Sequence, residues 1–200
     1  MQFKTHSHRF GLAITEKSEF SSEWSEIVEA IHSITDDEII STHEMRCSKR
    51  KSISKAINLL LHDRLVARNW EPESPIFNDS DYLQSRWRLD FAKENISIEV
   101  AFNHGEAIAW NLMKPVLASE LNHVNKKIQT RLGVVIMATE GMKEGGGFDS
   151  AVGTYEKAKR YLKPLQNQLS CPIVLIGLEA PESFRVEHVG KPKRARFVNL

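Results

Sequence analysis

The chain of 200 residues has only two cysteines, Cys47 and Cys171, which lie far apart and outside any metal-ligand spacing. Their scarcity excludes a disulfide framework and a cysteine-based zinc site. Long apolar runs are also missing, because LGVVIMA (132–138) and CPIVLIGL (171–178) are much shorter than the roughly 20 residues of a membrane helix. The first residues, MQFKTHSHRFG, contain no apolar signal-peptide segment. We therefore expect a reduced, cytoplasmic protein with no membrane partner.

Net charge is scarce as well, since 27 basic and 26 acidic residues leave a formal charge of +1. The basic residues are nevertheless unevenly distributed. Residues 46–55 contain five of them and residues 191–196 contain four, and neither segment contains an acid. Such segregation fits one polyanion-binding face, but two solvated surface runs would explain it equally well.

A content of 41% hydrophobic and 26% charged residues is typical of a folded globular chain. Hydrophobic periodicity then predicts a single α/β domain over residues 1–200. An N-terminal helical part, about 1–80, precedes a β-β-α-β-α-β core at about 86–180 and a basic tail at 181–200. Continuous apolar strands indicate a mixed central β-sheet flanked by helices. The expected elements are helices at 22–34 and 52–69, strands at 86–91 and 96–102, a helix at 106–129, a strand at 132–138, a loop at 140–150, a helix at 151–169 and a strand at 172–178.

The segment RLDFAKENISIEVAF (88–102) reads as two strands joined by a short turn, and each strand carries one carboxylate, Asp90 or Glu99. Adjacent antiparallel strands lie about 5 Å apart, so two carboxylates on one face could share a divalent cation. Mg²⁺ prefers oxygen ligands and typically takes one or two carboxylates plus substrate phosphate. The chemistry predicted is phosphodiester hydrolysis. The alternative is that Asp90 faces outward from its strand and that Glu99 is paired with Lys93 or Arg88.

The residues around this hairpin resemble the active-site segment of type II restriction endonucleases of the BglII and BstYI kind, within the PD-(D/E)xK nuclease fold. The resemblance rests on Asp90-Phe91 in the first strand and on Glu99-Val100-Ala101-Phe102 in the second. It extends over about residues 45–180, through NLLLHDRLVARNW upstream and GVVIMA and PIVLIGL downstream. It implies a Mg²⁺-dependent enzyme that cuts both strands of a short palindromic DNA site.

The resemblance also implies roles for individual residues. Asp90 and Glu99 would bind Mg²⁺ together with the main-chain carbonyl of Val100. Asn58 would support the site by hydrogen bonding to the carboxylates or to a water there, whereas the alternative is a solvent-facing polar residue on a helix. A lysine downstream of the catalytic strand, as in the related BamHI pattern, corresponds to Lys114.

DNA recognition and positioning are expected from other segments. The loop at 140–150 has glycines that permit close approach to DNA and side chains that can reach base edges, and the tail can contact phosphates. A two-fold DNA site calls for a homodimer, with the helix at 106–129 as a candidate dimer element, and the system would include a cognate DNA methyltransferase. The residues expected to contact DNA are His104, Lys114, Lys143, Ser150, Lys193, Arg194 and Arg196.

Ala101 departs from the family pattern, which has Gln, Glu or Lys at this position. Three explanations are open: the protein binds DNA without cutting, the register is shifted, or another group does this work. We favour the third, because Asp90, Glu99 and Asn58 are all present. Asn58, or Glu106 at the start of the next helix, would then orient the attacking water.

Overall fold

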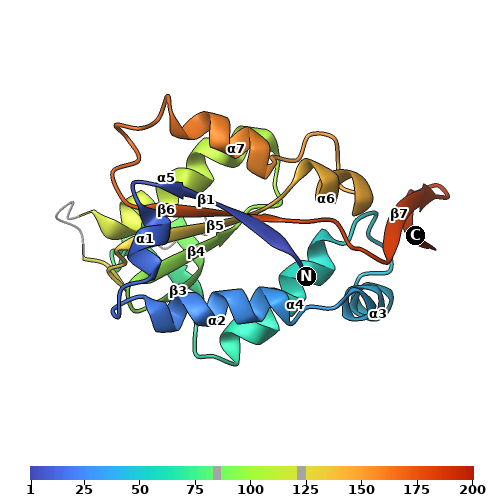
Figure 1. Cartoon of the computed structure of the whole chain (residues 1–200), viewed down its shortest axis with the longest axis horizontal. Coiled ribbons are helices and arrows are strands. Elements are labelled where there is room, and N and C mark those ends of the chain that lie inside the picture. Colours follow the sequence, from blue (N-terminus) through green and yellow to red (C-terminus); the bar gives the residue numbers. More distant parts are fainter. Residues whose placement is uncertain (83–86, 121–124) are drawn as a thin grey trace.

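The computed structural model describes residues 1–82, 87–120 and 125–200, in which a six-stranded sheet lies between helices (Figure 1). Its strand order is β1-β6-β5-β4-β3-β2, with parallel pairing among β4, β5 and β6 and antiparallel pairing elsewhere. The expected α/β fold with a mixed central sheet is confirmed. The elements are β1 (Phe3–His8), α1 (Gly11–Thr15), α2 (Ser21–His32), α3 (Asp36–Arg46), α4 (Ser54–Val66), β2 (Glu71–Pro75), η1 (Ser80–Tyr82), β3 (Arg88–Lys93), β4 (Ile96–Val100), η3 (Gly105–Ala107), α5 (Ile108–Ser119), β5 (Leu132–Ala138), α6 (Glu140–Gly145), α7 (Tyr155–Leu162), β6 (Ile173–Leu178), β7 (Phe184–Val189) and β8 (Arg194–Asn199).

The two faces of the sheet carry separate hydrophobic clusters. In β5, Val134 and Ile136 pack in the cluster that contains α2 and α4, whereas Val135 and Met137 pack in the cluster that contains α5 and α7. Figure 1 shows α2 and α4 on one side of the sheet and α5 and α7 on the other. Because side chains alternate along a strand, a strand covered on both faces is apolar throughout, which accounts for the run LGVVIMA.

The helix expected at 106–129 is wrong in length, because α5 ends at Ser119 and is preceded by the short η3 turn. Residues 121–124 lie outside the described residues. Beyond them the chain pairs with the segment before β3: Asn78 N–H donates to the Asn125 carbonyl (2.8 Å), and Phe77 forms a bridge with Lys126. Pairing with a distant segment therefore overrides the local helical pattern.

The loop expected at 140–150 is also partly wrong, because α6 occupies its first half. Thr139 starts this helix by accepting a hydrogen bond from the Met142 N–H (3.0 Å). A threonine cap of the same kind, Thr154, starts α7, which is shorter than the expected helix at 151–169. Threonine N-caps stabilise short helices, so the glycines at 145–147 end a helix rather than define a long loop.

The part at 1–80 is not purely helical, since β1 and β2 form the two edges of the sheet. β1 pairs with β6 from Phe3↔Leu178 to His8↔Ile173, so the first residues of the chain lie beside its last core strand. The basic segment at 181–200 is likewise a β7–β8 hairpin. Within the described residues, no helix is long and apolar enough to cross a membrane.

Candidate active site

The β3–β4 hairpin brings the two predicted carboxylates together. Phe91 pairs with Ile98, and the same antiparallel register carried one residue further places Asp90 across from Glu99. The Val100 N–H donates a hydrogen bond of 2.6 Å to Asp90 Oδ2, which fixes this carboxylate against the end of β4. The structure therefore brings Asp90 and Glu99 onto adjacent strands, as expected, and places the Val100 N–H against Asp90, while the role of the Val100 carbonyl stays a prediction.

Glu99 is almost completely buried, with 3% of its surface exposed. The Lys114 ammonium, on α5, donates a hydrogen bond to Glu99 Oε1. Glu99 Oε2 is enclosed and accepts no hydrogen bond from the described residues. A buried oxygen without a donor is costly, so this atom marks a position where a further partner is needed.

Both carboxyl groups have raised pKa values. Burial raises the pKa of Glu99, repulsion from Asp90 adds to the rise, and attraction to Lys114 opposes it. Burial also raises the pKa of Asp90, against the hydrogen bond from Val100 and the charge of Lys114. Two like charges on neighbouring strands, one of them buried, disfavour ionisation of both groups, and a bound cation would relieve the repulsion.

Asn58 lies on α4 and lines a pocket together with Asp90. A pocket of about 150 Å³ is shared by Asn58, Asp90 and Val100, and a neighbouring pocket contains Asn58, Val100 and Asn103. Asn58 Oδ1 is enclosed and, like Glu99 Oε2, lacks a hydrogen-bond partner among the described residues. Asn58 is therefore not a solvent-facing helix residue, whereas Glu106 is exposed in η3 and lines neither pocket.

Two residues that sequence reasoning missed line the same pockets. Glu73, on β2, lies between the paired residues Pro72↔Phe91 and Ser74↔Leu89, which places it across from Asp90. Its φ of 49° is unusual for a residue other than glycine and is costly where it occurs. Lys55, in the first turn of α4, lines both pockets. The sequence gives no sign that the Glu73 backbone has this unusual φ. Lys55 could have been found, because it belongs to the basic segment at 46–55.

The residues expected to contact DNA differ in their surroundings. Lys114 points inward to Glu99 and is only 12% exposed. Lys143 is partly buried and donates to Glu140 (3.2 Å) within α6. His104 and Ser150 are both exposed. The backbone of His104 forms a β-bridge with Val152, which brings His104 near the segment that contains Ser150.

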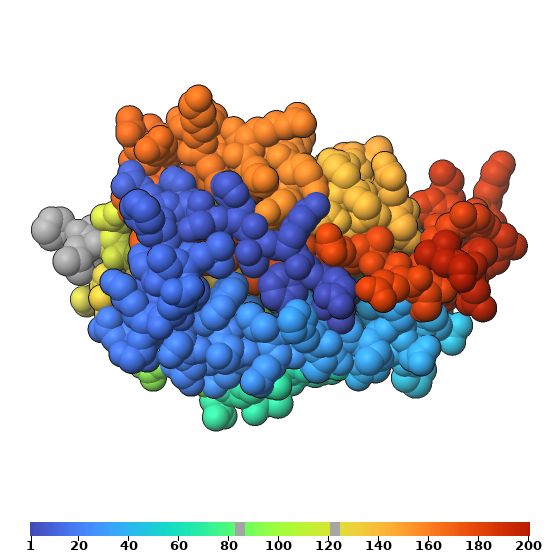
Figure 2. Space-filling model, viewed as in Figure 1, coloured from blue at the N-terminus to red at the C-terminus, as the bar shows by residue number. Residues whose placement is uncertain are grey.

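The two basic segments meet in space. The Ala195 N–H of β8 donates to the Arg50 carbonyl (3.2 Å), and His188 Nε2 lies 2.9 Å from the Lys51 carbonyl oxygen. Figure 2 shows the C-terminal hairpin at one end of the molecule. Lys193 and Arg194 are exposed there, whereas Arg196 pairs with Glu187 of β7.

The candidate dimer element, α5, is a core helix of this chain. Ile108, Leu112 and Val116 are buried against the sheet, and Leu117 is partly buried in a third cluster. These four side chains therefore pack within the chain itself.

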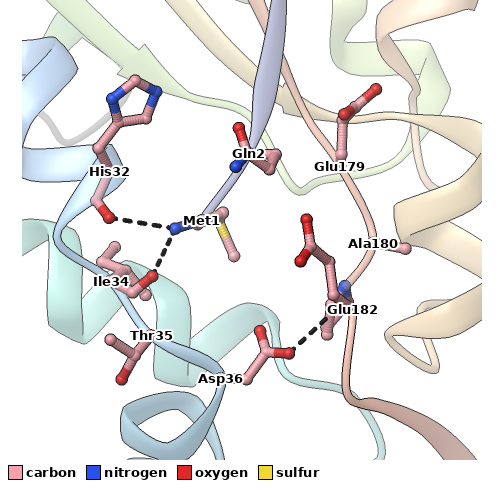
Figure 3. Close-up of a pocket in the computed structure, with 10 residues that line it drawn as sticks. Met1, Gln2, His32, Ile34, Thr35, Asp36, Glu179, Ala180 and Glu182 are labelled. Atoms are coloured by element: carbon pink, nitrogen blue, oxygen red, sulfur yellow. Dashed lines mark hydrogen bonds between the residues drawn. The ribbon is translucent and has the colours of Figure 1, made fainter. Parts of the chain in front are cut away.

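A separate pocket of about 220 Å³ surrounds the first residue and shares no lining residue with the candidate active site (Figure 3). The Met1 ammonium donates to the Ile34 carbonyl (2.5 Å) and the His32 carbonyl (3.3 Å). Asp36 accepts from the Glu182 N–H (3.0 Å). These contacts fasten β1 and the segment after β6 to the helical layer, so the polar groups of this pocket have structural partners.

A carboxylate pair on adjacent strands of a helix-flanked mixed sheet is the arrangement of a PD-(D/E)xK nuclease. The family model described as "Restriction endonuclease BglII/BglIII" matches residues 3–178. The chain belongs to this family and is a type II restriction endonuclease, a site-specific deoxyribonuclease of a family that generally needs a divalent metal. The comparison with curated proteins finds no match.

Two solved structures are similar over 100% of this chain and 100% of their own. The crystal structure of restriction endonuclease BglII complexed with a DNA 16-mer has 19% identity and a TM-score of 0.71. The crystal structure of free BglII has 18% identity and a TM-score of 0.57. At such identities the likeness shows the fold, and the fold is more similar to the DNA complex than to the free enzyme.

Proposed function

We propose that this enzyme uses Mg²⁺ to hydrolyse both strands of a short palindromic DNA site. The supporting observation is the Asp90–Glu99 pair on adjacent strands, in which Glu99 Oε2 is an enclosed oxygen without a hydrogen-bond donor. Asn58 Oδ1, in the pocket beside Asp90, is a second enclosed oxygen of this kind. Among the described residues, no group of three or more His, Cys, Asp or Glu side chains is arranged to hold a metal. Two carboxylates and a carbonyl suit Mg²⁺, which completes its shell with water and phosphate oxygens.

In the proposed mechanism, Asp90, Glu99 and the Val100 carbonyl would hold the ion. When bound, Mg²⁺ supplies positive charge that neutralises the phosphate and makes a water more acidic. Asn58 would orient the attacking water through its amide, since its side chain lines both pockets. Attack forms a bond from phosphorus to the water oxygen and breaks the bond from phosphorus to the leaving oxygen. The attacking water gives up a proton to solvent, and the leaving oxygen takes up a proton from solvent.

The DNA is proposed to approach along the end of the molecule where the basic segments meet. Lys193, Arg194 and Arg196 would contact phosphates, and His104, Lys143 and Ser150 would lie closer to the bases. Lys55 lines the pocket beside Asp90 and is a further phosphate contact. This proposal is supported by the backbone hydrogen bond from Ala195 of β8 to the Arg50 carbonyl, because it brings the basic segments at 46–55 and 191–196 into contact.

We further propose that the chain is a single endonuclease domain and acts as a homodimer. One carboxylate constellation cuts one strand, so two copies related by a two-fold axis match the two strands of a palindrome. The proposed compartment is the cytoplasm, where the DNA is, and the proposed genetic partner is a methyltransferase that protects the same site.

Plasmid digestion with Mg²⁺ and with a chelator tests this function, and sequencing of the fragment ends gives the cut position. We expect discrete fragments in the sample with Mg²⁺ and uncut plasmid in the sample with chelator. A gel shift without cutting, with either Mg²⁺ or Mn²⁺, would instead favour a DNA-binding protein that does not cleave. Sedimentation with and without the cleaved sequence tests the dimer.

A further inference from the structure

The residue at 101 and Glu99 share one face of the sheet. They are two positions apart in β4 and its extension, and alternate side chains leave a strand on the same side. Ala101 is 2% exposed and belongs to the cluster that contains Ile108 and Leu112 of α5. A methyl group there contributes no polar atom to the active site, so a polar contact with Glu99 on this face has to come from the helix that covers it.

Lys114 of α5 makes that contact. Its ammonium donates to Glu99 Oε1, and the side chains of Lys114 and Glu99 are 12% and 4% exposed. Removing two charges from water is expensive, and well-packed apolar residues often stabilise such a position as well or better. A buried ion pair between α5 and β4 therefore indicates that Lys114 has a role other than stability.

We propose that Lys114 is a positioning residue for Glu99, on the face where Ala101 offers no polar side chain. Lys114 holds Glu99 through Oε1 and leaves the enclosed Oε2 to a divalent cation, so that the two positive charges share one carboxylate. This role takes the place of the DNA contact expected for Lys114. It rests on the proposed metal-dependent hydrolysis at Asp90 and Glu99.

A second partly buried pair provides a matched control. Lys93 Nζ donates to Glu26 Oε1 (2.8 Å), with side-chain exposures of 21% and 24%, on the β3–α2 side of the sheet. This pair joins α2 to β3, and neither of its residues lines the active-site pockets. Lys93→Gln therefore removes a partly buried charge outside the candidate active site, where Glu26 keeps a hydrogen bond from Trp70 Nε1 (2.8 Å).

The first experiment measures melting temperatures of the free protein with chelator and with millimolar Mg²⁺, which requires no cleavage. Lys114→Gln leaves the Glu99 carboxylate buried without the Lys114 ammonium. The melting temperature of this variant in chelator should therefore be lower than that of the wild type by roughly 5 °C or more. Mg²⁺ should recover at least half of this loss in melting temperature, because the bound ion offsets the negative charge of Glu99 in place of the Lys114 ammonium. The loss caused by Lys93→Gln should be the same in both buffers.

A loss in Lys114→Gln that Mg²⁺ does not change overturns the proposal. Failure of this variant to fold in either buffer overturns it as well, because the cation then does not compensate Glu99. Folding only with Mg²⁺ is the strongest form of the expected result.

The second experiment measures single-turnover cleavage and DNA affinity. Lys114→Gln should cut about 10²-fold more slowly, Lys114→Arg should recover part of this rate, and Lys93→Gln should cut like the wild type. DNA affinity should change less than threefold, and the salt dependence should stay constant. A Lys114→Gln variant that cuts normally, or one whose salt slope falls by about one unit, overturns the proposal in favour of a structural or phosphate-binding lysine. If the wild type cuts no DNA, the proposed hydrolysis fails, but the melting experiment still decides the role of Lys114.

Discussion

The two β-hairpins of this protein carry opposite charge in opposite surroundings. In β3–β4 two carboxylates lie inside the sheet, and Glu99 is 3% exposed. In β7–β8 the basic residues Lys193, Arg194 and Arg196 are exposed, in a two-stranded sheet at one end of the molecule (Figure 2). Burial makes a charge costly, so a buried acid indicates chemistry in a way that an exposed base does not.

The difference predicts different consequences of mutation. A charge in the inner hairpin acts at short range on a few atoms, so its loss should change the rate of cleavage far more than DNA affinity. A charge in the outer hairpin acts through a solvated, salt-screened interaction, so its loss should change affinity and not the chemistry.

The largest effect is expected from Asp90→Asn or Glu99→Gln. Each removes a negative ligand, and several kcal/mol of charge stabilisation correspond to a loss of cleavage of about 10³-fold or more. DNA binding should persist or become tighter, because repulsion between carboxylate and phosphate falls. Single-turnover cleavage and binding assays measure the two quantities. The control is Glu94→Gln, an exposed acid in the turn of the same hairpin, and cleavage within tenfold of wild type by either active-site variant would remove the metal-site interpretation.

Asn58→Ala should have the next largest effect. Its amide borders both pockets beside Asp90 and Val100, and loss of a group that orients the attacking water is expected to cost about 10²-fold in rate. The single-turnover rate should fall while DNA affinity stays the same. Glu106→Ala is the contrast, since Glu106 lies outside both pockets. A normal rate for Asn58→Ala together with an inactive Glu106→Ala would assign the supporting role to Glu106.

The sequence predicted what local pattern determines. The apolar runs of β5 and β6 and the acids of β3–β4 follow from periodicity and spacing, and the structure brings Asp90 and Glu99 together as expected. β1 was missed because its polar residues (FKTHSH) belong to an edge strand, and its partner β6 is remote in sequence.

The remaining site features depend on tertiary structure. Whether Lys114 faces DNA or Glu99 depends on how α5 is rotated against the sheet, and the sequence does not specify this rotation. The contact between Arg50 and β8 and the unusual φ of Glu73 likewise arise only when distant segments pack. The catalytic and DNA-binding roles of all these residues stay predictions.

In the outer hairpin, Lys193, Arg194 and Arg196 should be replaced together by alanine. Each lost phosphate contact should lower the slope of log affinity against log salt by about one unit, without a change in sequence preference. Because Arg196 already pairs with Glu187, we expect a fall closer to two units than to three. The matched control replaces Lys159, Arg160 and Lys163, which lie on or directly after α7. An unchanged slope in the hairpin variant would show that the hairpin is only a solvated surface.

Ala101→Gln should have a small effect on rate and a measurable one on stability. The methyl group is enclosed between β4 and α5, and an enlarged side chain in a packed core typically costs about 1–3 kcal/mol of unfolding free energy. We expect cleavage within about tenfold of wild type, since Lys114 already supports Glu99. Chemical denaturation and single-turnover assays measure both. A gain in rate of more than tenfold would mean that the active site lacks the polar group that we assign to Lys114.

The smallest effect is expected from Glu187→Gln, the more exposed counterpart of the Glu99 variant, with a side chain that is 35% exposed. Hydrogen bonds from Arg196 and Arg185 lower the pKa of Glu187 in the folded protein. A lowered folded-state pKa contributes stability above the unfolded-state value, and this contribution is lost as the pH falls through the folded-state value. The variant should therefore melt slightly below wild type at neutral pH, by no more than about 2 °C because exposed ion pairs contribute little. The difference should vanish at acidic pH and in high salt, as melting curves across pH and salt would show. A large loss that salt does not screen would mean that the outer hairpin is held by buried charge like the inner one, and the contrast between the two hairpins would then be wrong.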